Sequence, residues 1–200
     1  DWGAAGFPAP CITEGACCRP MKVRPREVHI KRMATMAVSL ARNGAAPVEP
    51  KFSGEDLNRI LPVNQKRQYD AKQILARLTD NSEFMEYRSD YGPEVFTGIA
   101  KVDGFPVAFI GNNQGFFPDY PKYANDTYFG VGGKHYREGL IKQGEFVTLC
   151  GRDNLPIIWL QDTSGIDVGD LAEEAELLSL GQSLIYSIEQ TKLPMMLVVL

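Results

Sequence analysis

The sequence predicts an α/β domain whose sheet is partly parallel. The segment EVFTGIAKVDGFPVAFIGN (residues 94–112) contains two β-prone runs joined by a turn dipeptide. Further along, LPIIWLQ (155–161) and LPMMLVVL (193–200) are short apolar runs that each begin with Leu-Pro. Such runs are typical of strands buried on both faces of a parallel sheet. The helical pattern between them completes a strand–helix–strand unit, which is normally right-handed.

Residues 1–46 differ from the rest of the chain. They mix Gly, Pro, Cys and Arg without a sustained period, and only RMATMAVSLARNG (32–44) has the pattern of a short helix. The following AAPVEPKF has two prolines within eight residues, which is typical of a linker. We therefore expect a poorly ordered N-terminal segment and linker over residues 1–46, and one folded domain over residues 47–200.

Hydrophobic periodicity predicts three helices in that domain. The first lies within PVNQKRQYDAKQILARLTD (62–80), where Tyr69, Ile74, Leu75 and Leu78 share a face. The second spans residues 134–154, and its predicted apolar face consists of Leu140, Ile141, Phe146, Val147 and Cys150. The third is expected as one continuous helix over DLAEEAELLSLGQSLIYSIEQ (170–190).

The two β-prone runs near residue 100 predict a hairpin. Asp103-Gly104 suits a type I′ turn, because both central positions of that turn need positive φ. Pro106 lacks an N–H group, so it is expected at an edge or at a position without a ladder hydrogen bond. The closing run LPMMLVVL is interpreted as a buried central strand, which predicts that the natural protein continues beyond Leu200.

Composition and charge exclude several classes of function. The net charge of −4 argues against nucleic acid as a partner, and no apolar run is long enough to span a bilayer. His29 and His135 stand in no zinc-binding or triad-like pattern, so neither a metal site nor a Ser-His-Asp site is predicted. We interpret Cys11, Cys17, Cys18 and Cys150 as free thiols, which favours a reducing, cytoplasmic location.

The turn DTSGIDVG (162–169) is the first candidate site. It follows the strand LPIIWLQ and precedes a helix, and ligands of α/β sheets bind at that edge. Backbone N–H groups in such a turn can bind an oxyanion: a thioester enolate, a carboxylate or a phosphate. In the alternative interpretation, Gly165 only permits the turn, and Asp167 or Asp170 only caps the helix.

The loops before the second helix offer weaker candidates. FGVGGKHY (129–136) is no P-loop, because the position five before Gly133 is not glycine and His135 replaces the Ser or Thr. Gly132, Gly133 and Lys134 can still contact an anionic ligand, or they can form only a flexible loop. The loop GNNQGFFPDYP offers Asn112, Gln114 and aromatic rings for a flat organic ligand, although such loops more often pack over a core.

Three segments together resemble a known family: YGPEVFTGIAKVDGFPVAFIGNNQG, GVGGKHYREGLIKQGEFVTLCGRDNLPIIWLQDTSGIDVG and AELLSLGQSLIYSIEQTKLPMMLVVL. They are similar to the carboxyltransferase subunits of biotin-dependent acyl-CoA carboxylases and decarboxylases. The similarity is greatest to the second of the two crotonase-like domains in the glutaconyl-CoA decarboxylase branch. It runs from about Phe52 to the last residue, and residues before Pro47 do not share it.

The resemblance implies a crotonase-like ββα superhelix, here incomplete at its C-terminus, and a biotin-dependent carboxyl transfer. Biotin is carried by a separate protein or domain, and an acyl-CoA, such as glutaconyl-CoA, is the substrate. By resemblance, the Gly165 and Ile166 amides contact an oxyanion or biotin, and Ser164 shapes the turn. Asn112 and Gln114 line the same cleft. Preorganised N–H donors stabilise the enolate-like charge of such a reaction.

The chain departs from the complete family pattern in two ways. The small-residue turn that supplies the second pair of oxyanion amides is absent, and so is the N-terminal crotonase-like domain that holds most of the acyl-CoA. The resemblance also implies partners: a biotin carrier, another copy of the carboxyltransferase subunit, and for decarboxylases a sodium-pumping membrane subunit. We therefore expect this chain alone to be inactive.

Two alternatives stay open from the sequence. The first is a different crotonase-type acyl-CoA enzyme, which needs a carboxylate pair. Glu173, Glu174 and Glu176 are available for it, although their helical spacing is typical of a solvated surface. The second is a non-catalytic module that only dimerises.

Overall fold

The computed structural model describes residues 46–64, 67–118, 120 and 130–200. The predicted disorder of residues 1–46 and the predicted helix at 32–44 therefore fall outside the described residues, except for Ala46. The elements of the described residues are η1 (Gly54–Asp56), α2 (Leu57–Ile60), α3 (Lys72–Leu78), η2 (Asp80–Ser82), β1 (Met85–Glu86), β2 (Val95–Val102), β3 (Phe105–Asn112), β4 (Phe116–Phe117), β5 (Gly130–Val131), β6 (Lys134–His135), α4 (Arg137–Asp153), β7 (Ile157–Gln161), β8 (Gly165–Ile166), α5 (Asp170–Glu174), α6 (Leu177–Gln190) and β9 (Met195–Val199).

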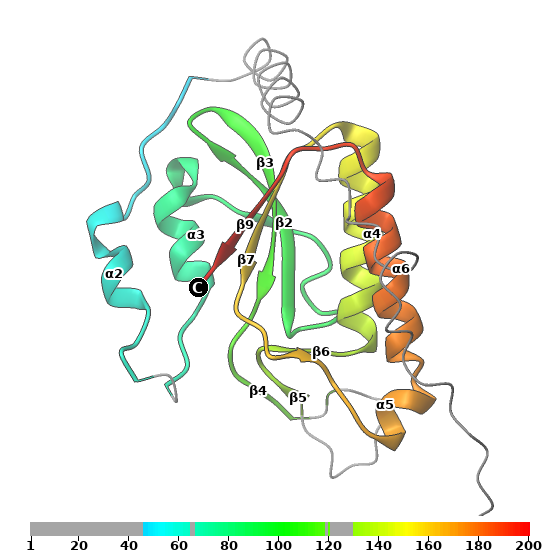
Figure 1. Ribbon diagram of the computed structural model, residues 1–200. Coiled ribbons are helices and arrows are strands. Elements are labelled where there is room, and N and C mark those ends of the chain that lie inside the picture. The colour runs from blue at the N-terminus through cyan, green and yellow to red at the C-terminus, as the bar shows by residue number, and fades with distance from the viewer. Residues whose placement is uncertain (1–45, 65–66, 119, 121–129) are drawn as a thin grey trace, which may run out of the picture.

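The main sheet has the strand order β1-β2-β3-β7-β9. Strands β1, β2 and β3 pair antiparallel, and β3, β7 and β9 pair parallel, with Ala108 opposite Ile157 and Ile157 opposite Met195. Helices α4 and α6 cover one face of this sheet, and α3 lies on the other (Figure 1). The predicted α/β class and the strand–helix–strand connection from β7 to β9 are confirmed.

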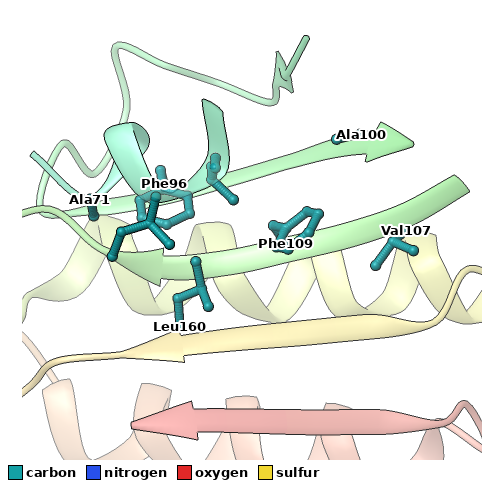
Figure 2. Close-up of a cluster of buried hydrophobic side chains, with 8 residues drawn as sticks. Ala71, Phe96, Ala100, Val107, Phe109 and Leu160 are labelled. Carbon is teal, nitrogen blue, oxygen red and sulfur yellow. The ribbon is translucent and has the colours of Figure 1, made fainter. Parts of the chain in front are cut away.

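Each face of the sheet has its own hydrophobic core. On the α3 side, Phe96, Phe109 and Leu160 pack with residues of α3, as Figure 2 shows. On the α4 side, Ala108, Ile110 and Ile157 pack against Phe146 and Val147 of α4. Because successive strand residues point to opposite faces, β3 and β7 supply both cores from alternate positions. This explains why both sequences are almost continuously apolar.

The hairpin prediction is confirmed in its detail. Asp103 and Gly104 have φ values of 53° and 79°, as a type I′ turn needs, and Val102 pairs with Phe105 across it. Pro106 lies opposite Lys101, one step from the pair that closes the turn. Ladder hydrogen bonds alternate along an antiparallel pair, so Pro106 occupies a position without one.

A buried carboxylate holds this turn from outside the hairpin. Asp80 accepts the Asp103 N–H at Oδ1 (2.8 Å) and the Gly104 N–H at Oδ2 (2.7 Å). We expect Asp80→Ala to lower the free energy of unfolding by about 2–4 kcal/mol, because the buried Gly104 N–H and the part-buried Asp103 N–H lose a charged acceptor. Urea unfolding checks this value. Asp90→Ala on the surface is the control and is expected to change stability by less than about 0.5 kcal/mol; equal effects would contradict this role for Asp80.

Three details of the expected elements are wrong. Helix α3 begins at Lys72, so Tyr69 precedes it. The expected helix over 170–190 is two helices, because Glu176 takes a left-handed conformation (φ 59°) between α5 and α6. In α4, Ile141 is only half-buried, and Lys142 and Gln143 are buried in its place.

Within the described residues, LPMMLVVL forms a strand that is neither central nor buried. Strand β9 lies at the edge of the described sheet, and Met196, Leu197 and Val199 are 51%, 56% and 73% exposed. Within the described residues, only β7 pairs with β9. An apolar run indicates that a strand tends to be buried, but it does not indicate whether a neighbouring strand is present to cover it.

Candidate active site

Two loops that are distant in sequence form one unit at the carboxyl end of the parallel strands. Strand β8, inside the turn 162–169, pairs in parallel with β6, so that Lys134 lies opposite Gly165 and His135 opposite Ile166. The Ser164 N–H donates to the Gly133 carbonyl (2.7 Å), and the Asp167 N–H donates to the His135 carbonyl (3.1 Å). The structure thus joins the two candidate sites FGVGGKHY and DTSGIDVG.

The two amides expected to bind an oxyanion differ in their surroundings. The Gly165 N–H donates to Thr163 Oγ1 (3.0 Å), and the same hydroxyl donates to the Gly133 carbonyl (2.7 Å). Successive N–H groups of a strand point to opposite sides. Gly165 has φ 127°, so this alternation applies only from Ile166 onward. Since the Asp167 N–H points toward β6, the N–H of the preceding Ile166 is expected to point away from it. Of the two amides, the Gly165 N–H serves the turn, and the Ile166 N–H is expected on the side away from β6.

Asp162 anchors the start of this turn. Its Oδ2 accepts hydrogen bonds from the Tyr69 hydroxyl (2.7 Å) and from Gln114 Nε2 (2.9 Å). Gln114 Nε2 also donates to the Asp162 carbonyl (3.0 Å), and the Asp162 N–H donates to Asn112 Oδ1 (3.2 Å). Burial and the neighbouring carboxylate raise the pKa of Tyr69, so its hydroxyl stays protonated as a donor. Gln114 therefore holds the turn in place.

The sequence prediction missed Tyr69 and Asp162. A signal for Asp162 was present, because an acidic residue directly follows the buried strand LPIIWLQ. No local pattern indicated Tyr69, which comes from the segment before α3 and reaches across 93 positions. Only the packing of α3 against the sheet brings the two together.

The glycines and lysine of the Gly-rich loop also have structural partners. A side chain at Gly132 would lie 2.5 Å from the Gly115 nitrogen, so Gly132 allows two loops to pack closely. Gly133 has φ 79° and supplies the carbonyl that binds the turn. Lys134 Nζ lies 2.8 Å from Asp167 Oδ1. Burial raises the pKa of Asp167, and a hydrogen bond from the Val168 backbone N–H opposes part of that effect by stabilising the charged carboxylate.

The alternative roles proposed for the acidic residues are not observed. The N-cap of α5 is Gly169, without a side-chain cap, so Asp167 does not cap this helix. Asp170 is the first residue of α5. Glu173, Glu174 and Glu176 are exposed, as expected for a solvated surface. The carboxylate pair that a hydratase-type mechanism needs is therefore not formed by these three residues.

An apolar cavity of about 380 Å³ lies beside the turn, between the sheet and α6. His135 and Gln143, which the sequence prediction did not select, are among its polar lining residues together with Asn112. Burial lowers the pKa of His135, which favours the neutral imidazole. The full lining consists of Ile110, Gly111, Asn112, His135, Gln143, Trp159, Leu160, Gln161, Leu184, Met195, Met196 and Leu197.

In the described part of the chain, no group of three or more His, Cys, Asp or Glu side chains is arranged to hold a metal ion. No helix there is both long enough and apolar enough to cross a membrane.

Comparisons with known proteins identify similar chains. The model of the carboxyl transferase domain family matches residues 29–200. Glutaconyl-CoA decarboxylase subunit alpha of Acidaminococcus fermentans is 55% identical over 148 residues, which cover 74% of this chain and 25% of that protein. The mitochondrial methylcrotonoyl-CoA carboxylase beta chain of Arabidopsis thaliana is 28% identical over 84% of this chain and 26% of its own length.

A solved structure shows the same fold. The beta subunit of geranyl-CoA carboxylase from P. aeruginosa superposes with a TM-score of 0.64 at 24% identity, over 85% of this chain and 30% of the subunit. The predicted crotonase-like fold is thereby confirmed. The chain spans about a quarter of the length of the two curated relatives. The family match begins at residue 29, within the segment that the sequence analysis set apart.

Proposed function

The chain belongs to the carboxyl transferase family, and from this premise we propose that it forms the biotin-facing part of a composite site for carboxyl transfer. In this proposal the carboxyl group moves between biotin and an acyl-CoA such as glutaconyl-CoA. Residues 47–200 correspond to the C-terminal-type domain, and a second domain of another subunit completes the site. Biotin reaches it on a separate carrier protein or domain.

Carboxyl transfer depends more on the stabilisation of negative charge than on a nucleophilic side chain. When a carboxyl group leaves the acyl-CoA, the electron pair of the broken C–C bond passes into the thioester enolate. When the carboxyl carbon bonds to or leaves the ureido nitrogen of biotin, charge develops on the ureido oxygen. An N–H group fixed in advance stabilises either oxyanion.

One observation supports this proposal above the others: by the alternation of strand N–H groups, the Ile166 N–H points away from β6 at the carboxyl edge of the sheet. The turn that contains it is fixed by several hydrogen bonds. Thr163 and Gly133 hold the turn from within, and Asp162 fixes its start. Such a donor does not need to reorganise as charge develops. We assign oxyanion or biotin contact to Ile166, and positioning of the turn to Ser164, Gly165, Gln114 and the Gly-rich loop.

The proposed partners follow from the family and from an exposed apolar surface. Leu178, Ile185 and Tyr186 of α6 are 84%, 61% and 62% exposed. Together with the exposed residues of β9, they support a homo-oligomer, in which such apolar side chains are covered. A sodium-pumping membrane subunit remains a prediction from the resemblance.

A titration followed by NMR tests the proposed function. We expect biocytin to shift the backbone amide of Ile166 and its neighbours in the ¹⁵N spectrum, because the ureido oxygen accepts from that N–H. Lipoyl-lysine, which has the same linker without a ureido ring, is the control and is expected to leave these signals in place. A protein that serves only in assembly would show no shift with either compound.

A further inference from the structure

The cavity beside the candidate site has a mostly apolar lining with a few polar residues. Trp159, Leu184 and Met195 are among the apolar ones, and Asn112, His135, Gln143 and Gln161 are the polar ones. With His135 neutral, none of its lining residues carries a formal charge. An uncharged lining of this kind suits a neutral ligand better than an anion or a cation, because a charged ligand would lose its hydration without gaining a counter-charge.

Asn112 presents a buried donor that lacks an acceptor. Its Oδ1 accepts the Asp162 N–H (3.2 Å), and because a backbone N–H only donates, the atom facing it must be the oxygen. The other end of the amide, Nδ2, has no hydrogen-bond partner among the described residues, although Asn112 is only 4% exposed. A buried donor without an acceptor costs about 1–3 kcal/mol. A ligand oxygen in the cavity would remove that cost.

His135 supplies a second donor, and its tautomer follows from its neighbour. Gln143 Nε2 donates to the Gly139 carbonyl (3.0 Å), which identifies this atom as the amide nitrogen. The same nitrogen lies 3.2 Å from His135 Nδ1, so its second proton points at that ring nitrogen. Nδ1 is therefore the acceptor, and the proton of the neutral ring is on Nε2. Nε2 has no partner within the described part of the chain.

We propose that this cavity binds a neutral carbonyl compound with a compact apolar body, whose oxygen accepts from Asn112 Nδ2 and His135 Nε2. Two neutral donors that line one cavity match the two lone pairs of a carbonyl oxygen. The aromatic and aliphatic lining of the cavity matches an apolar ring or chain. This inference goes beyond the proposed carboxyl transfer, because it uses neither the Ile166 amide nor biotin, and either can fail without the other.

Binding of cyclohexanone to the full chain tests the proposal. We expect it to shift the Asn112 side-chain amide and the Trp159 indole signals in the ¹⁵N spectrum. Methylenecyclohexane has nearly the same shape but lacks the oxygen, and it is expected to bind about tenfold more weakly, as for the loss of a hydrogen bond to a buried donor. Cyclohexanecarboxylate is expected not to bind. Equal affinities for the ketone and the alkene, or no shift with the ketone, would overturn the proposal and leave a cavity that holds only water.

Two variants locate the site. Asn112→Asp keeps an oxygen for the Asp162 N–H but removes the donor, and His135→Phe keeps a ring but removes Nε2. Each is expected to weaken cyclohexanone binding about tenfold or more. Asn113→Asp, the same change at a residue that does not line the cavity, is the control and is expected to bind normally. Thermal unfolding confirms that each variant is folded. Unchanged affinity in folded Asn112→Asp and His135→Phe would contradict the proposal.

Discussion

Replacing Ile166 with proline is expected to lower kcat for glutaconyl-CoA decarboxylation by roughly 10²–10³-fold, as for the loss of one oxyanion donor. The assay uses a chimaera in which this chain replaces the matching segment of the A. fermentans alpha subunit. Proline removes the N–H. Since that N–H is expected to point away from β6, the substitution is not expected to remove a hydrogen bond between β6 and β8.

Ile166→Ala is the matched control for this effect. It keeps the backbone N–H and shortens a side chain whose Cδ1 lies close to Gly181 of α6. We expect Ile166→Ala to retain kcat within about tenfold, and both variants to melt close to the parent chimaera. If folded Ile166→Pro kept the kcat of the parent, the turn would be structural only.

The second large effect is expected for Lys142→Met, which should lower the free energy of unfolding by about 3–5 kcal/mol. The Lys142 side chain is fully buried, and its Nζ donates to the carbonyls of Gly92 (2.9 Å) and Arg88 (3.3 Å). Nearby, the buried Glu94 accepts the Tyr136 N–H (3.1 Å) at the start of α4. Methionine fills similar space but leaves both carbonyls without this donor and Glu94 without a nearby positive charge.

Lys72→Met is the control, because the Lys72 side chain is 42% exposed in its ion pair with Glu86. We expect that variant to lose less than about 1 kcal/mol. The double variant Lys142→Met with Glu94→Gln is expected to recover part of the loss, because it removes the unpaired carboxylate as well. Urea unfolding measures all four proteins. A Lys142→Met variant as stable as the wild type would contradict this role of the buried ammonium.

The pH dependence of stability checks the same lysine. Burial lowers the pKa of Lys142 from 10.5 to about 8, and Glu94 opposes part of that shift. Between these values the unfolded chain binds more protons than the folded chain, so stability rises with pH from about 8 to 10.5. We expect this contribution to be absent in Lys142→Met.

The sequence predicted well those features that depend on neighbouring residues. Asp103-Gly104 specifies the hairpin because positive φ is needed at two adjacent positions. The strand LPIIWLQ specifies the parallel sheet because its apolar residues occupy both faces. The location of the candidate turn followed from the end of that strand. Each of these features depends on residues that lie close together in the sequence.

The features that the sequence did not predict depend on contacts between distant segments. Lys142 lies on the buried face of α4, where a lysine is not expected, because carbonyls of residues 88 and 92 accept from it. The break at Glu176 lies where α5 and α6 pack separately against Leu140. Asn112 and His135 reach one cavity only because β3 and the loop before α4 meet there.

The wild-type chimaera provides the most direct measurement of the central claim, that this chain contributes a carboxyltransferase half-site. With its biotin carrier, it is expected to release CO₂ from glutaconyl-CoA at a rate within about tenfold of the parent subunit, a barrier difference of about 1.4 kcal/mol. A chimaera that folds and assembles like the parent, but releases no more CO₂ than the reaction without biotin, would contradict the claim.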